Sequence, residues 1–228
     1  MDVSHYREQA RFALSGRWGK VILITLVAAL FGGLVVGTGL SFNFEIDEQT
    51  LSTLPREFQS VLRSYLMVAG GIGIILGIVQ FFMSGPVNLG YCCALLKLMD
   101  GENPSVSDLF SDMYRFWDGF LLALLRALFT FLWTLLFIIP GIIAAYRYSM
   151  SGFIMAQNFG ITPMNAIRAS KAMMKHRKFE LFLLDLSFIG WHLLAILSLG
   201  IGYIWITPYI NTTYAAFYRN NSYCFNFD

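Results

Sequence analysis

Residues 119–139 read GFLLALLRALFTFLWTLLFII, and Arg126 is the one charged residue in this run of 21. An α-helix rises by about 1.5 Å per residue, so a run of this length crosses the roughly 30 Å hydrocarbon core of a bilayer. The stretch therefore predicts a membrane-spanning helix. It also indicates the class of the whole chain, because comparable runs lie on both sides of it.

Five further runs are predicted to cross the membrane, namely residues 21–40, 65–83, 142–158, 181–199 and 203–218. Proline removes a backbone donor, so Ser84-Gly85-Pro86 predicts a kink and then a helical continuation to Lys97, with a re-entrant element over 84–97 as the alternative. Pro140-Gly141 and Gly200-Ile201-Gly202 predict tight breaks in the two later hairpins. The fold class is therefore an all-α polytopic membrane protein with six transmembrane helices, in a single integral membrane domain over residues 1–228.

Composition supports this class and excludes others. Hydrophobic residues make up 57% of the chain and charged residues 13%, whereas soluble domains have about 45–50% and 25%. The net charge of +2 argues against nucleic acid as a partner. No motif of catalysis, phosphate binding or metal ligation is present. We therefore expect a protein that is not an enzyme and has no cofactor, metal or catalytic residue; the first apolar run is too long for a cleavable signal peptide.

Basic residues are distributed unevenly between the predicted loops. With six spans, twelve lysines and arginines fall on one side and only Arg56 and Arg63 on the other, in the predicted outer loop over 41–63. Cytoplasmic loops carry such an excess, so both termini are predicted to be cytoplasmic. The densest cluster precedes the fifth span and supplies four candidate lipid-headgroup contacts, Arg168, Lys171, Lys175 and Lys178. The positive-inside bias alone is the other explanation of this cluster.

Short amphipathic segments precede the first, third and fifth spans and are predicted to form cytoplasmic interfacial helices. The second begins at Asn103-Pro104 and the third at Thr162-Pro163, both of which are typical helix starts. Each proline lies sixteen residues before a phenylalanine, Phe120 or Phe179, that opens an apolar span. The pattern predicts three copies of one unit, over 1–100, 101–160 and 161–219. The alternative is that any cytoplasmic loop beside a membrane is amphipathic.

Four ionisable residues form a candidate intramembrane polar site: Arg126, Arg147, Asp185 and His192. Such a residue costs several kcal/mol in lipid (~2.5–3.5 for Arg or Asp), so it faces protein or water and finds a partner. Arg126 and Asp185 are predicted at similar depths and should form an ion pair, which would serve either a substrate or helix packing. Arg147 is predicted to snorkel outward or to hold an anionic headgroup. His192 lacks a second ligand and is interpreted as a packing residue.

Several stretches resemble the DUF975 family of bacterial integral membrane proteins, whose function is unassigned. They are Ser84-Gly85-Pro86-Val87-Asn88-Leu89-Gly90, Pro140-Gly141-Ile142-Ile143, Ser170-Lys171 with Met173-Met174, and elements of the run from Phe179 to Tyr218. The outer loop near 41–62 departs from the family pattern. The resemblance implies a bacterial cytoplasmic membrane protein and no particular activity.

The function predicted from these features is that of a non-enzymatic, multi-pass cell-membrane protein that interacts with lipids or with other membrane proteins. Membrane lipids are the expected partner class, with other membrane proteins or a second copy of the chain as further candidates. The alternative is a small transporter or permease-like subunit with a site between spans three, four and five. Proline-broken helices at corresponding positions of repeated units point to such a site.

Overall fold

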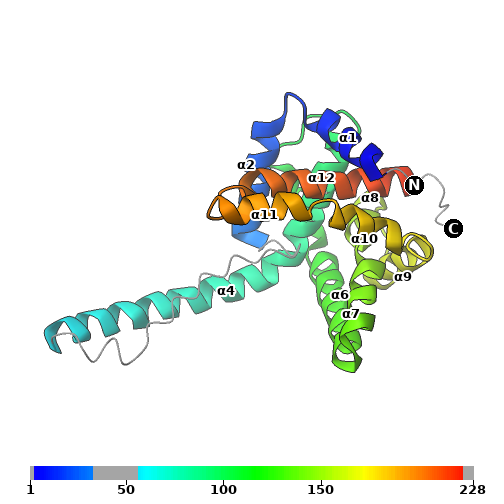
Figure 1. The fold of residues 1–228 in the computed structure, drawn as a ribbon. Coiled ribbons are helices and arrows are strands. Elements are labelled where there is room, and N and C mark those ends of the chain that lie inside the picture. The colour runs from blue at the N-terminus through cyan, green and yellow to red at the C-terminus, as the bar shows by residue number, and fades with distance from the viewer. Residues whose placement is uncertain (1–2, 33–55, 223–228) are drawn as a thin grey trace.

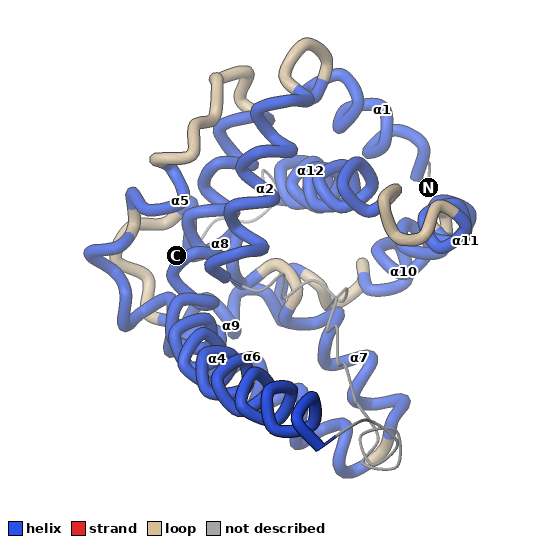
Figure 2. The backbone as a smooth tube through the Cα atoms, turned by 90° about the vertical axis from the view of Figure 1, so that its left-hand side faces the viewer, coloured by secondary structure: helices blue, strands red, loops and turns tan. Residues whose placement is uncertain are grey.

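The computed structural model describes the backbone of residues 3–32 and 56–222 and the side chains of residues 4–32 and 77–222. All regular elements within these ranges are helices, as predicted (Figures 1 and 2). They are α1 (Val3–Leu14), α2 (Trp18–Gly32), α4 (Arg56–Met99), α5 (Asp108–Ser111), the 3-10 turn η1 (Met113–Arg115), α6 (Phe116–Leu136), α7 (Ile138–Tyr148), α8 (Ser151–Gln157), α9 (Pro163–Met173), α10 (Lys178–Leu186), α11 (Ile189–Leu197) and α12 (Tyr203–Ser222). The end of the first predicted span and most of the outer loop lie outside the described residues.

Four described segments are long and apolar enough to cross a membrane: Gly77–Met99, Met113–Leu136, Ile138–Gln157 and Lys178–Leu197. The helices α1 and α2 meet at 100° and would together count as a fifth crossing. Much of the surface of these segments is apolar and exposed, and this is clearest on the α6–α7 hairpin, which projects from the body of the molecule (Figure 1). Around its tip Leu135, Phe137 and Ile138 are 75%, 69% and 72% exposed. A surface of this kind is suited to lipid rather than to water.

The structure agrees with the prediction at one proline and differs from it at another. The helix α4 continues through Pro86 to Met99, which confirms the helical continuation and leaves no place for a re-entrant element. The break expected at Pro140-Gly141 lies at Phe137 instead, whose φ of −158° and ψ of 147° are extended. Pro140 lies in the first turn of α7, where a missing N–H costs no hydrogen bond.

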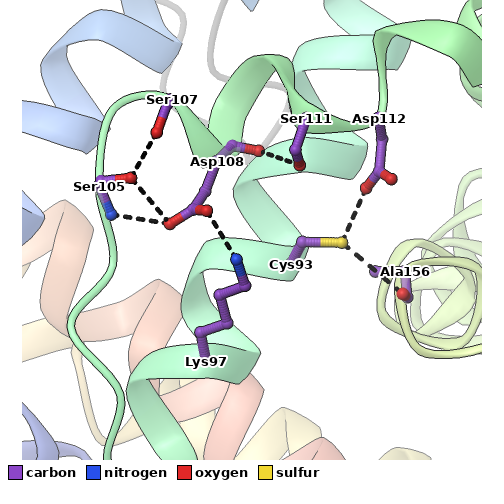
Figure 3. Close-up of polar contacts among 8 residues, drawn as sticks. All are labelled: Cys93, Lys97, Ser105, Ser107, Asp108, Ser111, Asp112 and Ala156. Atoms are coloured by element: carbon purple, nitrogen blue, oxygen red, sulfur yellow. Dashed lines mark hydrogen bonds and ion pairs between the residues drawn. The ribbon is translucent and has the colours of Figure 1, made fainter.

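The helix predicted to begin at Asn103-Pro104 is shorter than expected, since only the four residues of α5 and the turn η1 are helical. The carboxylate of Asp108 ties this segment to the end of α4 (Figure 3). It accepts hydrogen bonds from Lys97 Nζ at 2.7 Å and from the backbone N–H of Ser105 at 2.8 Å. These bonds hold the residues after Pro104 in a loop against the end of α4. By contrast, the helix predicted from Thr162-Pro163 is confirmed as α9, with proline in its first turn.

The second long helix of each predicted hairpin lies at the centre of the molecule. The helices α8 and α12 both pack against α4, and the Phe153 and Tyr218 rings of α8 and α12 stack with centroids 5.6 Å apart. The short helices pack around this centre, α5 on α4, α9 on α8, and α1 on α12. The first and last helices of the chain therefore lie together.

The apolar faces of the short helices point into the protein. In α9 the buried residues include Ala166, Ile167 and Met173, and in α1 Ala10 and Leu14 are fully buried. An interfacial helix that binds lipid directly turns its apolar face to the membrane, whereas these faces are covered by the protein's own helices. The long helices cover them because α1 packs on α12 and α9 packs on α8 and α6. The polar faces remain outward.

Candidate polar site inside the helix bundle

The stretch from Ser84 to Gly90, which resembles the family, brings α4 close to its neighbours. A Cβ atom on Gly85 would lie 2.3 Å from the carbonyl oxygen of Gly119 in α6, and one on Gly90 would lie 2.2 Å from that of Leu109 in α5. Both distances are far below van der Waals contact, so a side chain at either position would push the helices apart. The two glycines therefore let α4 approach α5 and α6. Asn88 lies between them in the sequence, and Tyr91 directly follows the second.

A cavity of about 60 Å³ lies among α4, α6, α7–α8 and α12. Its lining includes several polar side chains and comprises Asn88, Tyr91, Cys92, Leu95, Arg126, Ser149, Gly152, Phe153, Asn211 and Tyr214. A second cavity of about 30 Å³ also borders Asn88 and Arg126. A buried water needs about 10–15 Å³ by this kind of measure, so the larger cavity has room for roughly four waters or one small ion with water.

On one side of the larger cavity, Tyr91 joins three helices. Thr25 in α2 donates its hydroxyl proton to the carbonyl of Val21 at 2.7 Å, so the 3.0 Å contact between Thr25 and Tyr91 must be donated by Tyr91. The hydroxyl of Tyr91 in turn accepts from Asn211 Nδ2 at 3.2 Å. Both the donor and an acceptor position of Tyr91 are therefore used within the protein.

On the other side, two tyrosines bind Asp185. Tyr146 in α7 donates to Oδ2 of Asp185 at 2.7 Å, and Tyr214 in α12 donates to Oδ1. The predicted ion pair between Arg126 and Asp185 is wrong, since neither residue takes part in an ion pair among the described side chains. The two residues lie on either side of Tyr214, which lines the cavity of Arg126 and also binds Asp185. Tyr214 therefore lies between the two charged side chains.

The guanidinium of Arg126 borders both cavities. Its helix α6 packs against α4, with Gly119 at the close contact, so the arginine is directed to the interior of the bundle. No described side chain or backbone carbonyl forms a hydrogen bond or ion pair with it. A cation within an apolar helix needs an anion, a dipole or water. The cavity is therefore the polar environment of Arg126.

The other predicted site residues lie elsewhere. Arg147 is half-buried, and its backbone carbonyl accepts a hydrogen bond from Ser170 of α9 at 2.8 Å. The ring of His192 packs against Tyr203 with centroids 5.8 Å apart. Neither borders the cavities around Arg126. Within the described chain, no three His, Cys, Asp or Glu side chains are grouped so that they could hold a metal ion.

Sequence reasoning missed the polar residues that complete the site. Asn88, Tyr91, Asn211 and Tyr214 all line the cavity. The signal that could have revealed them is a repeated pattern, an asparagine followed three residues later by a tyrosine, which occurs as Asn88-Leu-Gly-Tyr91 and as Asn211-Thr-Thr-Tyr214. Three residues is close to one helical turn, so both side chains of each pair face the same way.

Comparison with known families gives one result. The model of the family described as "Protein of unknown function (DUF975)" matches residues 1–141 and 135–222, which together make up nearly the whole chain. Searches of curated proteins and of solved structures returned no match. The resemblance predicted from the sequence is confirmed, and the chain belongs to the DUF975 family.

Proposed function

We propose that this protein is a six-span, non-enzymatic protein of the bacterial cytoplasmic membrane, with both termini in the cytoplasm. Its proposed task is to bind anionic lipid headgroups at the cytoplasmic face. Other membrane proteins or a second copy of the chain would dock at the same face.

The sixth span in this proposal is α12. It has 20 residues, enough to cross the hydrocarbon core, and its low hydropathy has a structural reason. Its polar residues Asn211, Thr212 and Thr213 are all buried, so they face other helices rather than lipid. A helix at the centre of a bundle does not need an apolar surface all round.

The orientation follows from charge. The short helices, the turns that follow α1 and α9, and the starts of α2 and α10 carry most of the basic residues, whereas Arg56 and Arg63 belong to the other end of α4. Ion pairs and hydrogen bonds hold the basic end together, including Arg17 to the carbonyl of Gly101 at 2.7 Å and Arg219 to Asp100. The positive-inside rule assigns this end to the cytoplasm.

Three repeated units account for the order of the helices. Each unit would consist of a short helix followed by two long ones, as in α9, α10–α11 and α12. The contacts support the repeat, since each short helix packs on the last helix of the preceding unit: α5 on α4, α9 on α8 and α1 on α12. The last of these contacts closes the series into a ring.

The observation that carries the lipid proposal is the outer face of α9 and the segment after it. Arg168, Lys171 and Lys175 are exposed and Lys178 is half-buried, and no ion pair involves any of the four among the described residues. Because the apolar face of α9 is packed inside the protein, the cations are held outward on a fixed support. A basic residue near an anionic membrane surface gains about 1 kcal/mol.

The test compares purified protein in nanodiscs of phosphatidylcholine alone and in nanodiscs that also contain phosphatidylglycerol. We expect the wild type to melt several degrees higher with the anionic lipid. The variant R168Q/K171Q should lose a large part of that increase, and adding K175Q and K178Q should remove most of the rest.

The matched control is R56Q/R63Q, which removes the same charge at the other end of α4. It should keep the wild-type response to anionic lipid. An equal Tm of the wild type in both kinds of nanodisc would refute the proposal. So would a loss in the control as large as that in R168Q/K171Q.

Transport of a small solute is the second candidate, and the cavity around Arg126 is the observation that favours it. If the chain is a transporter, Arg126→Ala and Asp185→Ala should each abolish a solute-dependent flux in proteoliposomes while leaving the protein abundant. If both variants instead lose abundance and no flux accompanies the wild type, the polar residues serve packing.

A further inference from the structure

The three polar residues Thr25, Arg126 and Asp185 occupy the same position in successive units. The helices α1 and α2 begin 160 residues before α9 and α10, and the same step leads from Thr25 to Asp185. A step of 59 residues leads from Phe120 to Phe179, the residues that open two apolar spans, and also from Arg126 to Asp185. Each unit therefore presents one polar side chain at the same level of its first long helix.

In two units this side chain has a tyrosine partner from the second long helix. Thr25 accepts a hydrogen bond from Tyr91 at 3.0 Å, and Asp185 accepts one from Tyr214. Both tyrosines follow an asparagine by three residues and line the cavity. In the middle unit the corresponding pair that lines the cavity is Ser149 and Gly152, which have the same spacing.

The middle unit therefore has glycine where the others have tyrosine. Gly152 offers no hydroxyl to Arg126, and there is little room for one, because a Cβ atom there would already lie 3.1 Å from Cys92 Sγ and 3.5 Å from Asn88 Oδ1. Arg126 is left with an open cavity in place of a partner. Asp185, the one opposite charge at this level, already accepts from two tyrosines.

Asn88 supplies a second free donor. Its Oδ1 faces Cys92 Sγ, at 4.0 Å, and Gly152, and its Nδ2 has no acceptor among the described residues. Asn88 borders both of the cavities that Arg126 borders. A guanidinium and an amide N–H₂ that face one small cavity without protein acceptors are complementary to an anion.

We infer that the cavity among α4, α6, α8 and α12 binds a small monovalent anion, held by Arg126 and Asn88. One uncompensated positive charge suits one negative charge, and a volume of about 60 Å³ suits a halide, nitrate or formate. This inference concerns binding and does not depend on lipid binding at the cytoplasmic face. It also holds whether or not the anion crosses the membrane.

The experiment uses the full chain in phosphatidylcholine nanodiscs, with sodium gluconate as the only background salt. Chloride, nitrate, formate or phosphate replaces gluconate at constant ionic strength, and Tm is measured at each concentration. We expect Tm to rise by several degrees, in a saturable way, with one or more of the three small anions. Comparison of chloride with nitrate and formate shows whether the site prefers a halide or an oxyanion. Phosphate, which is larger and carries more charge, should give no rise.

Three variants locate the site. Arg126→Gln should abolish the response, and Arg147→Gln, which removes an arginine that does not border the cavity, should preserve it. Asn88→Asp places a carboxylate beside Arg126 and supplies the missing anion from the protein. This variant should melt higher than the wild type in gluconate and should no longer respond to added anions, so it tests the site even if Arg126→Gln fails to fold.

A wild type that responds to no small anion would overturn the inference and would indicate a cavity filled by water alone. A response that persists in Asn88→Asp, or one that phosphate matches, would also overturn it. Loss of the response in both Arg126→Gln and Asn88→Asp, with Arg147→Gln unchanged, would establish the site.

Discussion

At the scale of the residue, Asp108 shows how one carboxylate ties a loop to the end of a long helix (Figure 3). Burial opposes its ionisation, but hydrogen bonds from Lys97 and Ser105 outweigh that effect and hold the pKa of Asp108 below its usual value. The side chain is mostly buried, whereas Lys97 is about half exposed. The ionised form is therefore the one that stabilises the fold.

A dependence of stability on pH follows for this residue. Because the pKa is lower in the folded protein than in the unfolded chain, the stabilisation is present above the unfolded pKa of about 4 and disappears as pH falls through the folded value. Asp108→Asn should cost about 1–2 kcal/mol at pH 7 and progressively less below about pH 4. The measurement is the difference in Tm between wild type and variant in detergent, from pH 7 to pH 3.

The control for this prediction is Glu102→Gln, which changes an exposed carboxylate on the same loop. It should alter Tm little at any pH. A deficit of Asp108→Asn that is the same at pH 7 and pH 3 would contradict the role assigned to the ionised carboxylate.

Single residues were predictable from the sequence to the extent that they interrupt an apolar run. Arg126 and Asp185 are visible for that reason, and both lie inside the protein as expected. Their partners were not predictable, because hydropathy gives the level of a residue but not the side of the helix it occupies. Tyr146 and Tyr214 bind Asp185, and no property of tyrosine within an apolar run distinguishes a ligand of a carboxylate from a lipid-facing ring.

At the scale of the element, the contact between α4 and α6 depends on glycine. Gly85 lies against the backbone of Gly119 and Phe120, with no flexible side chain in between that could move aside. Gly77 lies two turns earlier on α4, and a Cβ atom there would meet nothing within 4 Å. Replacing each of these glycines by alanine therefore distinguishes the effect of close helix packing from the effect of helix propensity.

Gly85→Ala should destabilise the protein by about 3 kcal/mol or more, because two backbones must move apart. Gly77→Ala should be neutral or stabilising by up to about 1 kcal/mol, since alanine is the better helix former. Thermal unfolding of the two variants in the same detergent tests both. If Gly85→Ala is as stable as Gly77→Ala, α4 and α6 do not approach each other as described.

The sequence predicted which segments form helices, but it did not always predict the residues at which they begin and end. The start of α9 agrees with Thr162-Pro163 because proline lies in its first turn. The same signal failed at Pro104, since the next helix begins only at Asp108. The amphipathic pattern correctly predicted that α9 has an apolar and a polar face. It could not predict what each face contacts, because the burial of the apolar face by α8 depends on the packing of the whole bundle.

At the scale of the whole molecule, the proposal is a ring of three units around α4, α8 and α12. The contact between the first and last helices closes the ring, and it rests on several bonds. Asn220 donates to Gln9 at 2.5 Å, and Arg7 donates to the hydroxyl of Tyr209 at 3.4 Å. Next to this contact, Tyr6 of α1 donates to Glu180 of α10 at 2.9 Å. The rings of Tyr6 and Phe217 also pack, with centroids 5.3 Å apart. The sequence predicted three units from the spacing of Phe120 and Phe179, but closure could not follow from spacing alone.

Closure also explains the position of the cavity. The side chains that line it come from the last long helix of each unit together with Arg126. If the first unit did not pack on the third, the contact of Tyr91 with Asn211 could not form. The polar site therefore depends on the closed ring.

The measurement that tests this account most directly is a cross-link between α1 and α12. Gln9 and Asn220 are replaced by cysteine in a chain whose Cys92, Cys93 and Cys224 are changed to alanine, and membranes are treated with a short bifunctional methanethiosulfonate. The account predicts an efficient cross-link between the two cysteines, detected by mass spectrometry as linked peptides. The control places the first cysteine at Glu8, which is exposed on α1, instead of at Gln9, and should give little cross-linking. Equal or absent linkage in both pairs would contradict the closed ring.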